Sequence, residues 1–231
     1  MPTAFNRYLN RLRNYALYRR VRPYTMIATY GRFEDNLLIA ERHVRKQKLS
    51  GDYVECGVWR GGMSFAMMQL LPRYGVTGFH FFDSFEGLPE ATAKDGENAL
   101  SQQRNGELWF DDNSADHDQF LADLKSFEPS GVTTSVHKGW FEDTLGAFPA
   151  DGRIAVLRLD GDWFDSTMQC FETLWDRIVP GGLVLIDDYY DWSGCTNAVH
   201  RFLADRFVED NDFYCPVRAT KYGLAYLVKP L

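Results

Sequence analysis

Cysteine, long apolar runs and secretory features are scarce in this chain of 231 residues. Its four cysteines lie far apart and form neither the paired spacing of zinc sites nor a disulfide framework, so we expect reduced, mostly buried thiols. No apolar run is long enough to span a membrane, and the first residues lack the apolar stretch and cleavage site of a secretory signal. We therefore expect a cytoplasmic protein with no membrane span.

Positive charge is also in deficit, because 25 Lys and Arg stand against 32 Asp and Glu and give a net charge of −7. Nucleic-acid binding usually needs a basic surface, so we expect no nucleic-acid partner. Residues 1–48 nevertheless hold eleven Lys and Arg and three Asp and Glu, a net charge of +8, which leaves −15 for the remainder. We expect the chemistry in that acidic remainder.

Two widespread catalytic motifs are missing as well. Neither the Gly-Lys-Ser/Thr of a P-loop nor a Gly-x-Ser-x-Gly elbow occurs, and none of the five histidines pairs with another at metal-ligand spacing. The sequence therefore favours neither P-loop chemistry, nor a serine nucleophile, nor a histidine-based metal site.

The N-terminal part of the chain is predicted to be helical. Its first 22 residues are rich in arginine, and apolar residues recur at a spacing that places them on one helix face: Phe5, Tyr8, Leu9, Leu12, Tyr15 and Ala16. A second helix is expected over residues 33–47. We interpret residues 1–48 as a helical lid or as an oligomerisation segment of a homodimer or higher homo-oligomer, with membrane-surface contact as the alternative.

Residues 49–231 are predicted to form one α/β domain in which strands and helices alternate. Near-continuously apolar strands indicate a parallel sheet covered on both faces, and the last two strands should form an antiparallel hairpin. The expected strands are 53–58, 78–82, 132–137, 154–159, 183–186, 213–217 and 223–228, and the expected helices are 63–71, 116–125, 166–178 and 196–205. The long unpatterned stretch 87–113 is interpreted as a lid over the substrate or cofactor.

Ligands of an open parallel sheet collect at the carboxyl ends of its strands. After the first strand, Gly57, Gly61 and Gly62 permit a tight turn and close approach of the backbone to a ligand. Asp83 follows the second strand, at the position where a carboxylate binds ribose hydroxyls in nucleotide-binding sheets. Packing alone could also explain the glycines, and turn capping could explain Asp83.

Four carboxylates follow two strands that the pattern places side by side. Asp160 and Asp162 come after one strand, and Asp187 and Asp188 come after the other. Carboxylates this close repel one another unless a cation or another partner compensates, and an oxygen-rich site suits Mg²⁺, Mn²⁺ or Ca²⁺. Helix capping combined with surface charge is the alternative.

Four stretches together resemble the macrocin O-methyltransferase family, whose relatives include sugar O-methyltransferases of macrolide and aminocoumarin biosynthesis. They are Tyr-Val-Glu-Cys-Gly-Val-Trp-Arg-Gly-Gly at 53–62, Phe-Asp-Ser-Phe-Glu-Gly-Leu-Pro at 82–89, Leu-Asp-Gly-Asp at 159–162 with Asp-Ser-Thr at 165–167, and Pro-Gly-Gly-Leu-Val-Leu-Ile-Asp-Asp-Tyr at 180–189. The resemblance covers about residues 25–229. It implies a class I methyltransferase fold, Rossmann-like, with a seven-stranded sheet of order 3-2-1-4-5-7-6 and an antiparallel last strand.

The resemblance also implies S-adenosylmethionine and Mg²⁺, or Mn²⁺, as cofactors. It makes Asp160, Asp187 and Asp188 the metal ligands and Asp162 the general base, although some members carry a histidine where this chain has Trp163. It implies cofactor contacts from the glycine loop, from the end of the second strand and from an adenine wall after the third strand: Glu55, Gly57, Gly61, Ser64, Asp83, Ser84, Gly139, Trp140 and Asp160.

The function that follows is Mg²⁺-dependent methyl transfer to a hydroxyl of a small, sugar-bearing acceptor. One alternative is a nucleotide-sugar glycosyltransferase that uses Asp160-Gly-Asp162 as a metal-binding DxD motif. Another is a non-catalytic member that binds nucleosides or serves as a subunit of a complex. Aromatic residues that could line the acceptor pocket are Trp109, Phe110, Trp163, Tyr189, Tyr190 and Trp192.

Overall fold

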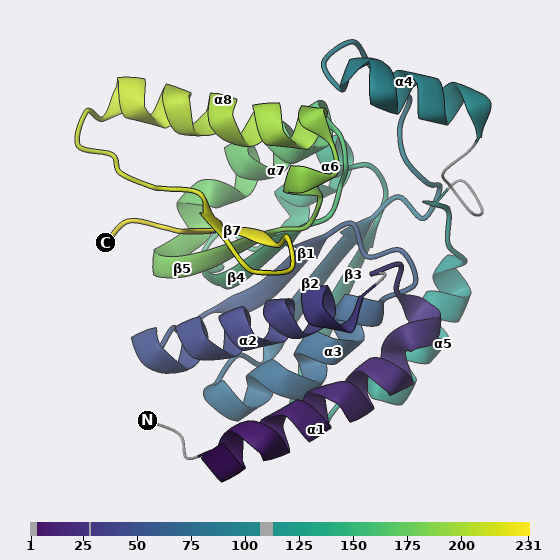
Figure 1. Ribbon diagram of the computed structural model, residues 1–231, viewed down its shortest axis with the longest axis vertical. Helices are drawn as coiled ribbons and strands as arrows, with labels where there is room; N and C mark the ends of the chain where they lie inside the picture. The colour runs from purple at the N-terminus through teal and green to yellow at the C-terminus, as the bar shows by residue number, and fades with distance from the viewer. Residues whose placement is uncertain (1–3, 28, 107–112) are drawn as a thin grey trace.

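The computed structural model describes residues 4–27, 29–106 and 113–231, with the side chains of residues 4–8 left aside. Its centre is a seven-stranded sheet of order β3-β2-β1-β4-β5-β7-β6 (Figure 1). The predicted fold class and strand order are therefore confirmed. The strands are β1 Asp52–Cys56, β2 Gly78–Asp83, β3 Thr133–Lys138, β4 Ile154–Leu159, β5 Ile178–Ile186, β6 Arg218–Ala219 and β7 Ala225–Val228. Strands β1 to β5 are parallel, and β7 runs antiparallel to β5 and β6.

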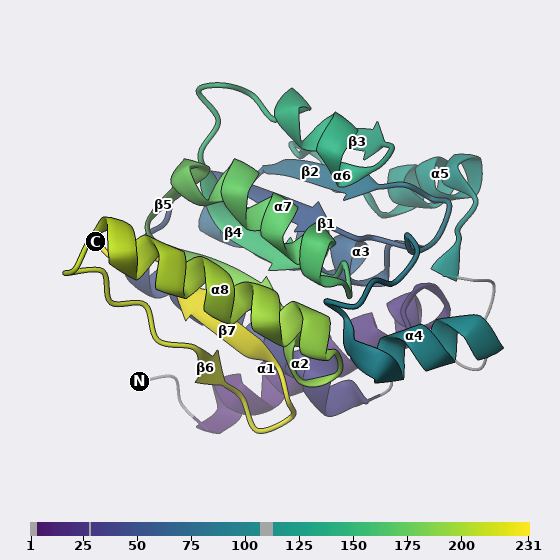
Figure 2. The ribbon, with the colours of Figure 1, turned by 90° about the horizontal axis from the view of Figure 1, so that it is seen from above.

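Helices cover both faces of this sheet. Helices α1, α2, α3 and α5 lie on one face and α6, α7 and α8 on the other, while α4 stands apart beyond the strand ends (Figures 1 and 2). The helices are α1 Ala4–Val21, α2 Tyr30–Gln47, α3 Gly62–Leu70, α4 Gly96–Asn105, α5 His117–Phe127, α6 Phe141–Thr144, α7 Phe164–Leu174 and α8 Ser193–Glu209. Within the described part of the chain, none combines the length and hydropathy needed to cross a bilayer.

Alternation along the strands explains the two hydrophobic cores. Successive side chains of a strand point to opposite faces. Leu183 and Leu185 of β5 accordingly pack into the core under α1, α2, α3 and α5, whereas Val184 and Ile186 pack into the core under α7 and α8. Because β5 is buried on both faces of the sheet, its sequence is a continuous apolar run rather than an alternating pattern. The four cysteines are free and buried, as expected.

Backbone hydrogen bonds join the loops that leave the central strands. The amide of Gly57 donates to the carbonyl of Phe82, that of Asp160 to Cys56, and that of Asp187 to Leu159, at 2.9–3.0 Å. Strand order reverses between β1 and β4, where a parallel sheet opens a crevice for ligands. The fold therefore brings the loops after β2, β1, β4 and β5 together at one edge.

The N-terminal helices share the main core with the sheet. Val21, Phe33 and Leu37 are fully buried in the same cluster as β1 and β2 side chains. The predicted apolar face of α1 does not pack there: Leu9, Leu12 and Tyr15 are 46–49% exposed. The face that does pack carries Asn14, Leu17, Tyr18 and Val21. Helices α1 and α2 therefore pack in the same core as α3 and α5.

Three sequence predictions about elements need correction. Residues 213–217 form no strand, because Pro216 lacks an amide hydrogen and the neighbouring Phe213 and Cys215 pack into the core beneath α8. The stretch 87–113, which had no recognisable pattern, contains α4. Its polar sequence lacks the apolar periodicity that predicts a helix. Strand β5 begins at Ile178, within the predicted helix 166–178, since α7 ends at Leu174.

Candidate active site

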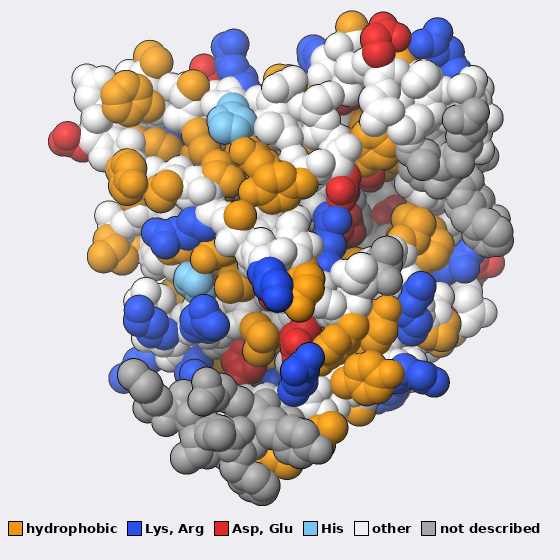
Figure 3. Space-filling model, in the orientation of Figure 1, with side chains coloured by type: hydrophobic (Ala, Val, Ile, Leu, Met, Phe, Trp, Pro, Cys, Tyr) orange, Lys and Arg blue, Asp and Glu red, His pale blue; other side chains and the backbone are white. Residues whose placement is uncertain are grey.

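A cavity of about 1430 Å³ opens at the carboxyl ends of the central strands. Among the described residues, thirteen Asp and Glu and four Lys and Arg line it. Acidic side chains are visible in a hollow on this face of the molecule (Figure 3). The cavity is therefore suited to a cation or a neutral polar ligand rather than to an anion.

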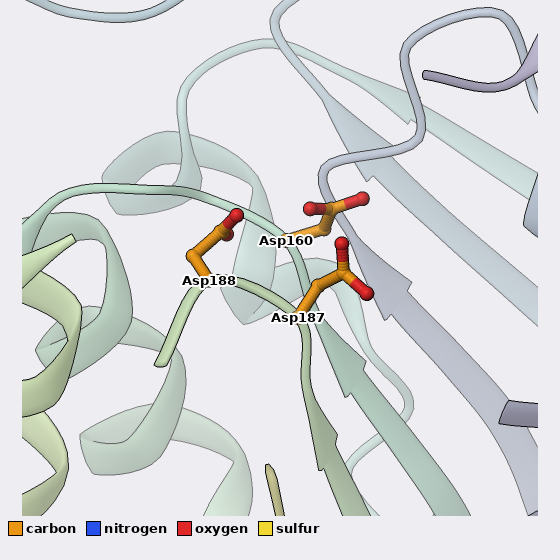
Figure 4. Close-up of side chains that lie close together, drawn as sticks. All are labelled: Asp160, Asp187 and Asp188. Atoms are coloured by element: carbon orange, nitrogen blue, oxygen red, sulfur yellow. The ribbon is translucent and has the colours of Figure 1, made fainter. Parts of the chain in front are cut away.

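Three carboxylates converge at the floor of the cavity. Asp160 follows β4, and Asp187 and Asp188 follow β5; Leu159 pairs with Ile186, so the residues after them are brought face to face (Figure 4). One oxygen atom from each of the three lies within 4.8 Å of the others. Asp187 and Asp188 are buried, and the Asp160 side chain is 32% exposed toward the cavity. An oxygen-only set of this size fits Mg²⁺ or Mn²⁺.

Arg158 lies directly beneath these carboxylates and is only 1% exposed. Its Nη1 donates to Oε1 of Glu55 at 2.9 Å and to Oδ2 of Asp160 at 2.7 Å. Its Nη2 lies 3.1 Å from Oδ1 of Asp187, an ion pair without hydrogen-bond geometry. Oδ1 of Asp187 therefore accepts no hydrogen bond from the described residues and keeps its lone pairs available to a cation.

A second arginine approaches from α2. Arg32 donates to Oδ2 of Asp191 at 2.7 Å and to the backbone carbonyl of Asp187, and it lies 3.4 Å from Oδ2 of Asp187. Arg32 and Arg158 together offset the negative charge of Asp160 and Asp187. Burial raises the pKa of Asp188, and the charges of Asp162 and Asp160 raise it further. Ionisation of Asp188 is thus disfavoured by burial and by its neighbours, a cost that a bound cation would offset.

Asp162 lines the cavity beside this cluster with an uncommon backbone conformation. Its φ of 57° lies in the left-handed region, which few residues other than glycine adopt. Its amide donates to Oδ2 of Asp188 at 3.1 Å, and its Oδ1 accepts a hydrogen bond from Nε1 of Trp192 at 2.8 Å. Burial, followed by the charge of Asp160, raises the pKa of Asp162 to about 8. Such a carboxyl group can hold a proton near neutral pH.

Glu55 and Ser64, which the sequence predicts to contact the cofactor, are both buried in the protein interior. Glu55 is almost fully buried and accepts hydrogen bonds from the hydroxyls of Ser64 at 2.6 Å and Tyr53 at 3.0 Å, besides its ion pair with Arg158. Burial raises the pKa of Glu55 to about 7, although the charge of Arg158 opposes this. Glu55 reaches the cavity wall, but Ser64 and Gly61 do not line the cavity.

The glycine loop and Asp83 are bound to each other. Oδ2 of Asp83 accepts the amides of Val58 at 2.7 Å and Trp59 at 2.8 Å, and Oδ1 accepts the amide of Phe85 at 2.6 Å. A Cβ added at Gly57 would overlap the carbonyl oxygen of Asp160. The residue types thus have internal packing and turn-forming roles, and the predicted ribose contact of Asp83 stays a prediction.

The remaining predicted positions also border the cavity. Ser84 lines it while its hydroxyl donates to the carbonyl of Gly87 at 3.0 Å, and Gly139 and Trp140 line it after β3. Of the aromatic residues considered for the acceptor pocket, Trp163 lines the cavity; Trp109 and Phe110 lie outside the described residues. Tyr189, Tyr190 and Trp192 are not among the lining residues.

Sequence reasoning missed Arg158, Arg32 and the contact of Trp192 with Asp162. One signal was available for Arg158, because it is a lone charged residue inside an otherwise apolar strand and such a residue is almost never buried without partners. Arg32 comes from a helix remote in sequence, and Trp192 lies 30 residues after Asp162, so neither contact follows from a local pattern.

Replacement of Arg158 by methionine is expected to lower the free energy of unfolding by about 3–5 kcal/mol, because three carboxylates lose their buried partner. Loss of the arginine removes the charge that lowers the pKa of Glu55 and of Asp160, so the pKa of both groups rises in the folded state. The folded protein then binds protons that the unfolded chain releases, so the deficit should be larger at pH 8 than at pH 6. Urea denaturation at both pH values measures it.

The matched control is Arg201→Met, which removes an arginine paired with Asp205 on the surface. Exposed pairs contribute about 0–1 kcal/mol, so this variant should unfold almost as the wild type does. An equal decrease in the free energy of unfolding for the two variants would show that the buried ion pairs of Arg158 stabilise the protein no more than an exposed pair does.

Comparison with known proteins agrees with this architecture. The family model "Macrocin-O-methyltransferase (TylF)" matches residues 4–214. The solved structure of the O-methyltransferase NovP superposes with a TM-score of 0.73 at 28% identity, covering 90% of this chain and 83% of that one.

Two characterised relatives are similar in sequence. The chain is 39% identical over 174 residues to 8-demethyl-8-(2,3-dimethoxy-α-L-rhamnosyl)-tetracenomycin-C 4'-O-methyltransferase of Streptomyces olivaceus, covering 73% of this chain and 64% of that protein. It is 31% identical over 186 residues to mycinamicin III 3''-O-methyltransferase of Micromonospora griseorubida, covering 76% of this chain and 71% of that protein. The match to the Streptomyces olivaceus relative thus spans less than two thirds of its length. From the extent of these matches, the chain belongs to the macrocin O-methyltransferase family.

Proposed function

We propose that this protein transfers a methyl group from S-adenosylmethionine to a hydroxyl of a sugar carried by a small molecule. In this proposal Asp160, Asp187 and Asp188 hold Mg²⁺ or Mn²⁺, and Asp162 accepts the proton of the reacting hydroxyl. The observation that carries the proposal is the convergence of three carboxylates at the ends of β4 and β5, next to a fourth carboxylate of raised pKa.

Methyl transfer to a hydroxyl has three requirements: alignment of the reacting atoms, removal of a proton and a positive charge near the hydroxyl. The cavity must align the acceptor oxygen with the methyl carbon and the sulfur, because the sulfonium is already reactive and alignment is the main need. Asp162 must take the hydroxyl proton as the oxygen–carbon bond forms and the carbon–sulfur bond breaks. A divalent cation held by the three aspartates supplies positive charge that makes the hydroxyl more acidic.

Charge in the cavity supports a sulfonium donor and a neutral acceptor. The four lining cations are all paired with carboxylates: Arg32 with Asp187 and Asp191, Lys94 with Asp165, Arg158 with Glu55, Asp160 and Asp187, and Arg201 with Asp205. Among the described lining residues no lysine or arginine is left for a pyrophosphate. This disfavours the nucleotide-sugar glycosyltransferase, whose substrate is a diphosphate.

The N-terminal segment 1–48 is proposed to shape the acceptor side of the cavity and to join subunits of a homo-oligomer. Tyr24 to Ile27 and Arg32 line the cavity, which supports the first role. Leu9, Leu12 and Tyr15 remain half exposed, which supports the second. Light scattering of the full chain measures the oligomeric state, and a monomer at micromolar concentration would contradict the second role.

Two binding titrations and one assay test the function. S-adenosylhomocysteine is expected to bind in calorimetry, whereas uridine diphosphate with Mn²⁺ is expected not to bind. Labelled S-adenosylmethionine is then offered with a panel of rhamnosides and macrolide glycosides that carry free hydroxyls. The panel includes a rhamnosyl tetracenomycin and mycinamicin III, the acceptors that the names of two relatives give. Binding of the diphosphate without binding of S-adenosylhomocysteine would overturn the proposal in favour of glycosyl transfer.

A further inference from the structure

The carboxylate of Asp162 is held by one side chain. Its Oδ1 accepts a hydrogen bond from Nε1 of Trp192 at 2.8 Å, and its Oδ2 accepts none from the described residues. The backbone on either side is fixed as well, because the Asp162 amide donates to Asp188 and φ is 57°. The carboxylate thus keeps one oxygen engaged and the other available.

Trp192 is itself rigidly placed. It precedes the first residue of α8, and its backbone amide donates to the carbonyl of Asp188 at 3.0 Å. Its ring meets the ring of Trp163 edge to face, with centroids 5.2 Å apart, and Nε1 of Trp163 donates to the carbonyl of Pro89 at 2.9 Å. The amide bond to Asp188 fixes the Trp192 backbone, and the Trp163 ring packs against the indole. Few alternative rotamers of Trp192 are therefore open.

Trp192 does not line the cavity, whereas Asp162 does. Trp192 contacts two residues that do, Asp162 through its indole N–H and Trp163 through its ring, and the hydrogen bond to Asp162 is the contact that reaches a carboxylate. A hydrogen bond to a carboxylate is stronger than one between neutral groups, so it is well suited to selecting a single orientation.

We propose that Trp192 is a positioning residue for methyl transfer: its indole N–H engages Oδ1 of Asp162 and thereby presents Oδ2 to the acceptor hydroxyl. This inference rests on the proposed function. In the step it serves, the acceptor proton moves to Oδ2 while the acceptor oxygen bonds the methyl carbon and the carbon–sulfur electron pair remains on sulfur.

The test is the variant Trp192→Phe, which keeps an aromatic ring against Trp163 but removes the N–H. With the acceptor that reacts fastest in the glycoside panel, kcat is expected to fall about tenfold, since a mispositioned base lowers the rate of the chemical step. The KM values for S-adenosylmethionine and for the acceptor should stay within about twofold of wild type, because Trp192 does not line the cavity.

The matched control is Trp175→Phe, which makes the same change at a buried tryptophan in the core beneath α8. Its kcat should equal that of wild type, so any general cost of losing a buried indole is measured separately by thermal denaturation. A second measurement places Trp192→Phe in an Asp162→Asn background, where it should lower residual turnover no further.

The outcomes separate the two proposals. Absence of methyl transfer by the wild-type protein to every acceptor in the panel overturns the proposed function. Methyl transfer by the wild type, with an unchanged kcat in Trp192→Phe, overturns only the positioning role. An equal fall in kcat for Trp192→Phe and Trp175→Phe also overturns it, as does an equal fall with and without Asp162.

Discussion

Asp162→Asn is expected to lower kcat by about 10²–10⁴-fold, the range that general-base catalysis contributes. The amide cannot accept the hydroxyl proton, yet it keeps an oxygen that can accept the Trp192 N–H seen at Oδ1. The fold of the site should therefore survive. Binding of S-adenosylhomocysteine and of Mn²⁺, measured by calorimetry, is expected to stay within a few-fold of wild type, while initial rates of methyl transfer report kcat.

The control for this substitution is Asp176→Asn, which makes the same chemical change at a surface carboxylate whose side chain is 77% exposed. It lies away from the cavity lining and should leave kcat unchanged. Near-normal turnover in Asp162→Asn would remove this residue from the role of base.

Removal of divalent cations is expected to abolish methyl transfer, and added Mg²⁺ is expected to restore it. The reason is the excess negative charge at Asp160, Asp187 and Asp188, which cannot assist the loss of a hydroxyl proton without a cation. Dialysis against EDTA followed by readdition of Mg²⁺ measures the effect. S-adenosylhomocysteine binding in the chelated protein serves as the control for intact structure, because chelation should not change the fold.

The corresponding variant is Asp188→Asn, chosen because Asp188 pairs with neither Arg32 nor Arg158. Its amide oxygen can still accept the Asp162 N–H, so the loop keeps its bond while the ligand loses its charge. Mn²⁺ affinity is expected to fall by at least about tenfold. Full activity of the chelated wild type, or unchanged Mn²⁺ affinity in this variant, would exclude these residues as a catalytic metal site.

The central strands and the convergence of the aspartates could be predicted because they depend on short-range patterns. Apolar runs indicate buried parallel strands, and Asp160 and Asp187 directly follow two of them. Neighbouring parallel strands end at the same edge, so adjacency in the sheet was enough to bring the two residues together. Helix α4 escaped prediction because its only fully buried residue is Ala99, too weak a signal against its polar neighbours.

The rest of the site depends on side-chain placement across the fold. Arg158 is an ion-pair partner of Glu55 only because β1 and β4 are in a register that pairs these two residues. Asp162 accepts the Trp192 N–H across 30 residues of sequence and from a backbone with positive φ. Neither the register nor the dihedral angle has a signature in local sequence. Gly57 illustrates two roles that the sequence pattern does not separate, because it lines the cavity and also accommodates the backbone of Asp160.

The amide of Gly57 donates to Phe82, one residue before the end of β2, and the amides of Asp160 and Asp187 donate to the last residues of β1 and β4. Three loops are thus joined in series at the carboxyl ends of the strands. A fluctuation that frees one of them must break a bond to the next. Local opening should therefore involve all three loops as a single cooperative unit. Hydrogen–deuterium exchange at these three amides should accordingly give one common protection factor, and the proposed donor and cation sites should be lost together as the protein unfolds.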